Sequence, residues 1–190
     1  MSIDQRTRLL KDERELGRDE VFDDVLTTAL STHGDLAGRG ATYKEAPPLG
    51  LSVDGRGLTL RVRDGVMTAA PGVADAGVAA EMAEDALSDL VQDSQSTMGL
   101  AMTSRVQLTA GDINEWIGWE PILRALFDGR KVHETGDVTF VDRDGGSLDL
   151  DRSFTIDDDR DEIANFLIEA GFLHIEKVFD ESEMARVADD

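Results

Sequence analysis

Cysteine is absent from all 190 residues, which excludes disulfides and thiolate chemistry. Basic residues are few, since 19 lysines and arginines stand against 40 aspartates and glutamates, giving a formal net charge of −21. A surface with this charge repels phosphate backbones and anionic lipid headgroups, so nucleic-acid partners and electrostatic membrane binding are disfavoured. The plainer explanation, that the charge only keeps the protein soluble, is favoured.

Long apolar runs are also missing. No stretch approaches the ~20 residues that a membrane-spanning helix needs, and no basic segment with an apolar core opens the chain. These absences predict a cytoplasmic protein without membrane insertion. The hydrophobic content of 41% is nevertheless enough for a real core, and 190 residues suit one large domain or two small ones.

Helical periodicity comes first along the chain. Residues 1–18 form a charge-dense N-terminal arm, and apolar residues then recur every three to four positions from Val21 to Leu30. Gly34 is expected to end this helix, because glycine favours helix termini. The prolines and glycines of residues 36–50 then predict an irregular loop.

The hydrophobic period then changes to two. Leu58, Leu60 and Val62 alternate with polar residues, and the Asp-Gly pairs at 54–55 and 64–65 are typical of hairpin turns. This pattern predicts three antiparallel strands in a meander. The polar face of the middle strand is expected to meet water.

The best-marked helices lie within residues 112–129. Asp112 followed by Glu115 is a capping-box pattern, in which each side chain satisfies a free backbone N–H at the helix start. Pro121 suits the first turn of a second segment, and Gly129 ends it. The buried stripe of that segment comprises Ile122, Leu123, Leu126 and Phe127.

The structure of the remaining segments is predicted from their composition more than from a hydrophobic period. Helix propensity prevails over residues 73–100, most clearly over 84–95. Asp144-Gly145 predicts another hairpin turn. The acidic residues 151–160 are expected to form a linker before a final helix and strand.

Three histidines are the only candidates for transition-metal chemistry. His33 with Asp35, and His174 with Glu176, have the His-x-acid spacing that supplies two of the three ligands in a facial iron triad. Acids fill 40 of 190 positions, so such a match arises often by chance, and we predict no metal site here.

No glycine-rich phosphate loop stands between a strand and a helix. The residues alone therefore do not argue for catalysis, and no catalytic residue is assigned.

Methionines and aromatic residues gather in the middle of the sequence, where two interpretations stand. They form plain core, which is the commoner role at such spacing, or they line an adaptable apolar cavity. The candidate cavity residues are Leu60, Val62, Met67, Met98, Met102, Trp116, Leu123, Leu126 and Phe127.

The order of these elements resembles the sterol-carrier-protein-type lipid-binding family over residues 19–150. The matching features are an opening helix, the hairpin LTLRVRDGVMTA, a helix, and then QLTAGDINEWIGWEPILRALFDGRKVHETGDVTF. The resemblance implies an α+β fold, a mainly antiparallel twisted sheet covered by helices on one face, with an apolar tunnel for a lipid or fatty acyl chain. It also implies an edge strand over residues 77–82, against the helix propensity there. The chain departs from the family in its longer acidic front end and in lacking an SKL-like terminus.

Residues 161–190 carry a separate resemblance. DEIANFLIEAGFLHIEKVFDESEMARVADD resembles the opening of the phytanoyl-CoA dioxygenase family, with a helix, a hydrophobic strand after Gly-Phe, and a helix capped by Asp180 and Glu183. The resemblance implies a longer parent oxygenase that uses Fe(II) and 2-oxoglutarate, with its iron triad downstream. It also implies that this chain is a truncated N-terminal piece, inactive and free of cofactors on its own.

Three functional hypotheses remain open. In the first, the chain is a binding module for a fatty acid, sterol or acyl-CoA and works with the missing C-terminal oxygenase domain. In the second, only the parent hydroxylase is functional, and this domain is structural or regulatory. In the third, it is an interaction domain whose cavity is collapsed and filled by its own side chains. A cavity above about 300 Å³ would favour the first hypothesis over the third.

Overall fold

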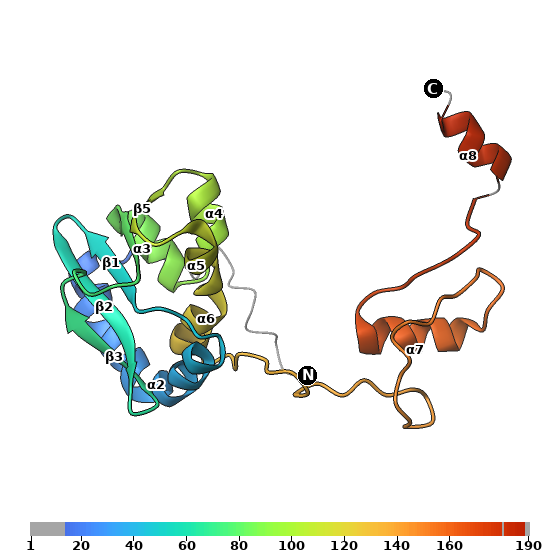
Figure 1. Ribbon diagram of the computed structural model, residues 1–190, viewed down its shortest axis with the longest axis horizontal. Helices are drawn as coiled ribbons and strands as arrows, with labels where there is room; N and C mark the ends of the chain where they lie inside the picture. Colours follow the sequence, from blue (N-terminus) through green and yellow to red (C-terminus); the bar gives the residue numbers. More distant parts are fainter. Residues whose placement is uncertain (1–13, 180, 189–190) are drawn as a thin grey trace. The chain divides into compact units, whose positions relative to one another are not determined.

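The computed structural model describes residues 14–179 and 181–188. The chain divides into two compact units, one ending at Glu134 and one beginning at Thr135 (Figure 1). The first unit holds a five-stranded sheet and most of the helices. The domain limits predicted at residues 18, 150 and 160 stay predictions.

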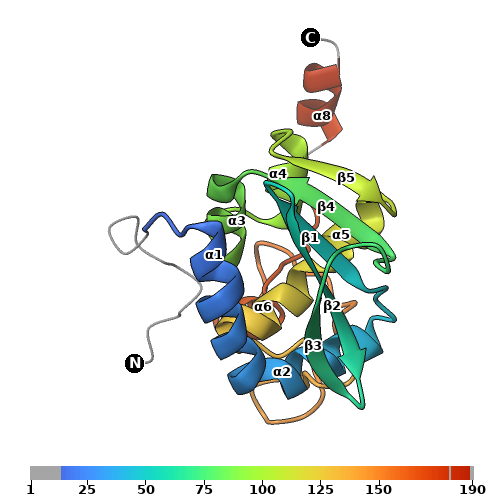
Figure 2. The ribbon, with the colours of Figure 1, turned by 90° about the vertical axis from the view of Figure 1, so that its left-hand side faces the viewer.

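The sheet of the first unit has the strand order β3-β2-β1-β4-β5 (Figure 2). Only the β1–β4 pair is parallel, and the other three pairs are antiparallel. The predicted α+β fold with a mainly antiparallel sheet and helices is therefore confirmed. The strands are Leu49–Val53 (β1), Arg56–Arg63 (β2), Val66–Pro71 (β3), Val78–Met82 (β4) and Val106–Ala110 (β5).

Two Asp-Gly turns fix the register of the first three strands. Asp54 and Gly55 have φ of 48° and 78°, and Asp64 and Gly65 have φ of 52° and 83°, the left-handed values of a two-residue hairpin turn. As a result Leu60 of β2 pairs with a leucine of β1 and is fully buried. The predicted meander and its inward face are confirmed.

The helices of the first unit include one long, continuous opening helix with a π-helical turn near its start. The described part of this unit contains Arg18–Glu20 (α1), Val21–Val25 (η2), Leu26–Tyr43 (α2), Glu84–Val91 (α3), Thr97–Met102 (α4), Ile113–Gly118 (α5) and Glu120–Asp128 (α6). The capping box at α5 is present, since the Asp112 carboxylate accepts from the N–H of Glu115 at 3.0 Å and Glu115 caps the N–H of Asp112 at 2.9 Å. Gly129 ends α6 with φ of 67°, as predicted.

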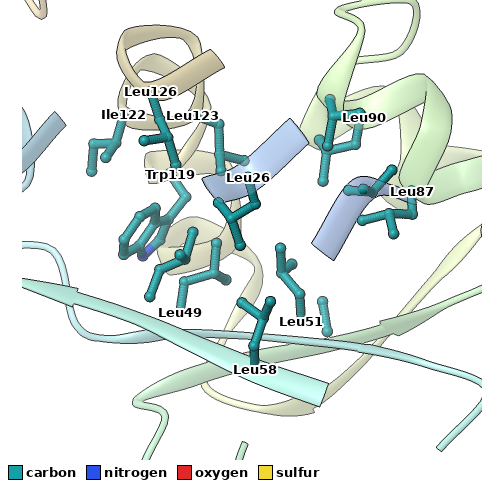
Figure 3. Packing of buried hydrophobic residues seen from close by; sticks show 14 of the residues in the cluster. Leu26, Leu49, Leu51, Leu58, Leu87, Leu90, Trp119, Ile122, Leu123 and Leu126 are labelled. Atoms are coloured by element: carbon teal, nitrogen blue, oxygen red, sulfur yellow. The ribbon is translucent and has the colours of Figure 1, made fainter. Parts of the chain in front are cut away.

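The core lies between the sheet and the helices. Side chains of α6 and of α2 point toward leucines of β1 and β2 (Figure 3). The strand residues Leu58, Leu60 and Val62 share one hydrophobic cluster with the α6 residues. This packing gives the sheet its buried face.

The opening helix is longer than the sequence predicts, because its glycines serve close packing instead of termination. A Cβ built on Gly38 would lie 2.2 Å from the backbone oxygen of Gly65 in the β2–β3 turn. A Cβ on Gly40 would lie 2.5 Å from Cγ2 of Val132. The helix therefore continues past Gly34 to Tyr43, so the predicted helix end is wrong, and the irregular loop predicted over residues 36–50 is confined to residues 44–48.

The segment after residue 73 also differs from its propensity. Residues 78–82 form a strand, as the family resemblance implies, but β4 lies between β1 and β5 and is not an edge. Its inward side chains Val78, Ala80 and Met82 are buried, and this burial outweighs helix propensity. The helix predicted over 84–95 is shorter and ends at Val91, and β5 is an additional strand.

The outer face of the middle strand is covered at Thr59 but open at its end, where Arg63 is exposed, so the prediction that this face meets water is wrong at Thr59. Thr59 is 1% exposed, and its hydroxyl donates to the backbone oxygen of Gly72 at 2.7 Å. The chain after β3 folds back over this face, where Val73 lies 3.1 Å from the position of a Cβ on Gly50.

The second unit contains two described helices, Arg160–Ala170 (α7) and Glu181–Ala188 (α8). Phe154, Phe166 and Phe172 stack edge to face at centroid distances of 5.1 and 5.5 Å. The hairpin predicted at Asp144-Gly145 is present as a turn closed by one isolated bridge. The strand predicted after Gly171 is also reduced to one bridge, because a single strand lacks neighbours to pair with.

The capping box predicted at Asp180 lies outside the described residues. Within the part of the chain that is described, no helix is both long and apolar enough to cross a membrane.

Candidate functional site

A cleft of about 580 Å³ opens in the helical layer of the first unit. Its walls come from the opening helix, the C-terminal end of α3, the last turn of α6 and the chain just before α1. The lining residues are Arg14, Leu16, Glu20, Asp24, Val25, Thr28, Ala29, Thr32, His33, Val91, Gln92 and Phe127.

The opening helix supplies the longest wall through two rows of side chains spaced four residues apart. Residues at this spacing lie on one helix face, and here a mainly apolar row runs beside a polar one. The π-helical turn η2 contributes Asp24 and Val25, one residue to each row, and such turns occur often at functional sites. The first row is Val25, Ala29 and His33, and the second is Glu20, Asp24, Thr28 and Thr32.

Residues 14–17, which we call the strap, contribute Arg14 and Leu16 to the cleft lining. The side-chain amide of Gln92 donates to the backbone oxygen of Arg14 at 2.7 Å. The backbone N–H of Leu16 donates to the hydroxyl of Ser88 at 3.0 Å. The side chain of Leu16 is also buried, with only 4% of the residue exposed. The strap is therefore held by hydrogen bonds to α3 and by apolar burial.

The mouth of the cleft carries an ion pair and an additional carboxylate. Arg14 donates to the Glu20 carboxylate through both terminal guanidinium nitrogens, with Nη1 3.1 Å from Oε2. These hydrogen bonds lower the pKa of Glu20 and raise that of Arg14. Asp24, one turn further along, has no ion-pair partner among the described residues.

His33 closes the inner end of the helix rows. Its Nδ1 lies 2.9 Å from the backbone oxygen of Leu126. A carbonyl oxygen only accepts, so Nδ1 carries the hydrogen and the neutral ring has its lone pair on Nε2. The ring is thereby fixed against α6 and the turn at Gly129.

The structure places the nine predicted cavity residues at different depths. Phe127 lines the cleft. Val62 is partly buried, and Met98 and Met102 are 48% and 79% exposed on α4. The other five are buried in the core, namely Leu60, Met67, Trp116, Leu123 and Leu126. That all nine line one ligand cavity stays a prediction.

Sequence reasoning missed most of the cleft. The spacing of Val25 and Ala29 is visible in the sequence, where it predicts a helix but not a binding site. The strap is joined to Gln92 across 78 residues, and no local pattern signals such a contact.

The histidines do not assemble a metal centre in the described part of the chain. There, no three histidine, aspartate or glutamate side chains gather in a way that could hold a metal ion. His174 instead has its Nδ1 3.0 Å from the hydroxyl of Ser153. The absence of tight iron binding by this chain stays a prediction.

The fold and the cleft together define an α+β protein with an amphipathic site in its helical layer. No family model matches the chain, and no curated protein matches it either. Among solved structures it is similar to sterol carrier protein 2 from Yarrowia lipolytica in its apo form, at 15% identity over 57% of this chain and 91% of that one, with a TM-score of 0.45. A second sterol carrier protein 2 matches at 17% identity over 57% and 98%, with a TM-score of 0.45.

A larger protein shares part of the same similarity. The stereoselective inverting sec-alkylsulfatase from Pseudomonas sp. matches at 17% identity over 47% of this chain and 14% of its own, with a TM-score of 0.37. At these levels of identity and TM-score, the similarities carry no argument about function. The functional proposal rests on the cleft instead.

Proposed function

We propose that the first unit binds a single small molecule with a hydrocarbon chain in the cleft beside the opening helix. The observation that carries the proposal is the cleft volume of about 580 Å³. Pockets for small ligands typically measure about 300–1,000 Å³ and are lined by apolar side chains with a few polar groups. Val25, Ala29, Val91 and Phe127 supply the apolar lining, and the polar row supplies the rest.

The binding energy would come from burial of the chain. Each buried methylene contributes about 0.8 kcal/mol, so ten of them give roughly 8 kcal/mol before ordering costs. If ordering costs about 2 kcal/mol, the net of about −6 kcal/mol corresponds to a dissociation constant of about 40 μM. The cleft is therefore suited to reversible binding and release.

The test is a substitution that fills the cleft with a large side chain from its exposed helix wall. Thr28 is exposed, so Thr28→Trp should fold normally and place an indole in the cleft. We expect this variant to bind N-phenylnaphthylamine, a neutral fluorescent probe, at least about tenfold more weakly, which equals the loss of two buried methylenes. Displacement of the probe by dodecanol gives the affinity for a plain alkyl chain.

Ser31→Trp is the matched control, because Ser31 is exposed on the same helix and lies outside the cleft lining. It should bind the probe like the native chain. Equal binding by all three proteins would reject the cleft as the site.

A second candidate function is supported by the interior of the same unit. Trp116, Trp119 and Leu123 are buried between the sheet and the helices, where a carrier tunnel would run. Trp116 and Trp119 also donate their indole N–H groups to backbone oxygens of Thr97 and Pro47, at 2.8 and 3.0 Å. This filled interior favours the alternative of an interaction domain without a ligand, which is the outcome if the probe fails to bind.

The role in a larger oxygenase is a hypothesis that rests on the resemblance of residues 161–190 alone. In it, the binding module serves a parent that resembles an Fe(II)- and 2-oxoglutarate-dependent phytanoyl-CoA dioxygenase. The complete reading frame tests it, because a downstream His-x-Asp with a distal histidine is required. A frame without these residues would remove the hypothesis.

A further inference from the structure

We propose that the cleft selects cationic amphiphiles, such as long-chain amines, over fatty acids and other anionic lipids. The inference rests on the proposed function and adds the chemical class of the ligand. Its basis is the charge of the described cleft lining, where Asp24 has no ion-pair partner among the described residues and the one guanidinium, that of Arg14, already binds Glu20.

The first step concerns the arginine. A fatty acid would need a cation for its carboxylate, and Arg14 is the only lysine or arginine in the described cleft lining. Its guanidinium binds Glu20 through two nitrogens, so an incoming carboxylate must compete with an existing bidentate pair. His33 cannot replace it in neutral form, because its one N–H already donates to Leu126.

The second step concerns Asp24. This residue lies in the polar row of the helix wall, directly beside Val25 of the apolar row. An ammonium group placed at Asp24 would allow its chain to run along the apolar row toward His33. The row from Val25 to His33 spans roughly 12 Å at 1.5 Å per residue, which matches a chain of about ten carbons.

The surrounding charge acts in the same direction. The lining, as far as the structure describes it, carries two carboxylates and one guanidinium, and the whole chain has a formal net charge of −21. A field of this sign attracts cations to the mouth and repels anions, most strongly at low ionic strength. Chain burial thus supplies affinity, and the charge at the mouth supplies selectivity.

The experiment compares dodecylamine, dodecanol and lauric acid, each below its solubility limit and any critical micelle concentration, as displacers of N-phenylnaphthylamine at pH 7. The three share a twelve-carbon chain and differ in headgroup charge. We expect the amine to bind about fivefold more tightly than the alcohol, as for a favourable exposed ion pair, and the acid to bind more weakly than the alcohol. The difference should shrink when salt screens the mouth.

Asp24→Asn should remove most of the amine's advantage over the alcohol. Asp35→Asn removes the same formal charge from an exposed site on the same helix, outside the cleft lining, and should leave the advantage intact. Equal loss in both variants would overturn the inference, because it would assign the preference to total charge alone.

The outcomes separate this inference from the function on which it rests. If the alcohol binds and Thr28→Trp blocks it, but the acid binds as well as the amine, the ligand class is wrong and the cleft stands. If none of the three displaces the probe, the proposed function fails, and the inference fails with it.

Discussion

Gly38→Ala should lower the free energy of unfolding by about 3 kcal/mol, the effect expected for overpacking against a rigid neighbour. The added Cβ would lie 2.2 Å from the oxygen of Gly65 and 2.9 Å from the nitrogen of Met67. Both are backbone atoms of the β2–β3 hairpin, so neither can swing aside as a side chain would. The opening helix must then move away from the sheet, and its cleft wall moves with it.

Gly118→Ala is the matched control for this substitution. Gly118 is also helical, in α5, and nothing lies within 4 Å of the added Cβ. Alanine should therefore stabilise the protein by up to about 1 kcal/mol through helix propensity. Urea unfolding measures both variants. Similar free energies of unfolding for the two variants would show that α2 does not touch the hairpin as described.

Arg124→Ala should destabilise the first unit by about 3–5 kcal/mol, because it removes the buried cation from a cluster of three carboxylates that keeps the more exposed Arg130. The side chain of Arg124 is 7% exposed and lies 2.9 Å from Asp128, 3.2 Å from Glu120 and 3.4 Å from Asp93. It also donates to the backbone oxygen of Leu90 at the end of α3. Thus it joins α6 to α3, the two elements that present Phe127 and Val91 to the cleft.

Two readouts follow for Arg124→Ala. Its urea midpoint should fall, and its affinity for N-phenylnaphthylamine should fall as the two walls separate. Arg39→Ala is the control, since Arg39 is 64% exposed in its ion pair with Glu134, and such pairs contribute at most about 1 kcal/mol. If Arg124→Ala loses no more stability than Arg39→Ala, the structural role of the buried cluster is contradicted.

The parts of the fold that could be predicted are those with local causes. The Asp-Gly turns need left-handed backbone at two successive positions, and both turns are where the sequence indicates. The capping box at Asp112 and the stop at Gly129 are equally local. Alternation of apolar residues was enough to place Leu60 on the buried face.

The errors arose where distant segments decide the local structure. Gly34 looks like a helix terminator and Gly38 like part of a loop, yet both allow α2 to approach a hairpin about thirty residues later. Residues 78–82 favour helix by propensity, but strands on both sides hold them in the sheet. The cleft depends on contacts of the same kind between the strap and α3, so the sequence could not reveal it.

The most direct test of the central claim is a titration of dodecanol into isotope-labelled protein, followed by methyl NMR. Val25, Ala29 and Val91 report on the cleft, while Leu49 and Leu60 report on the buried face of the sheet. We predict saturable shifts in the three cleft methyl groups and little change in the two leucines. Shifts confined to the leucines would place the ligand between sheet and helices and contradict the cleft as the binding site.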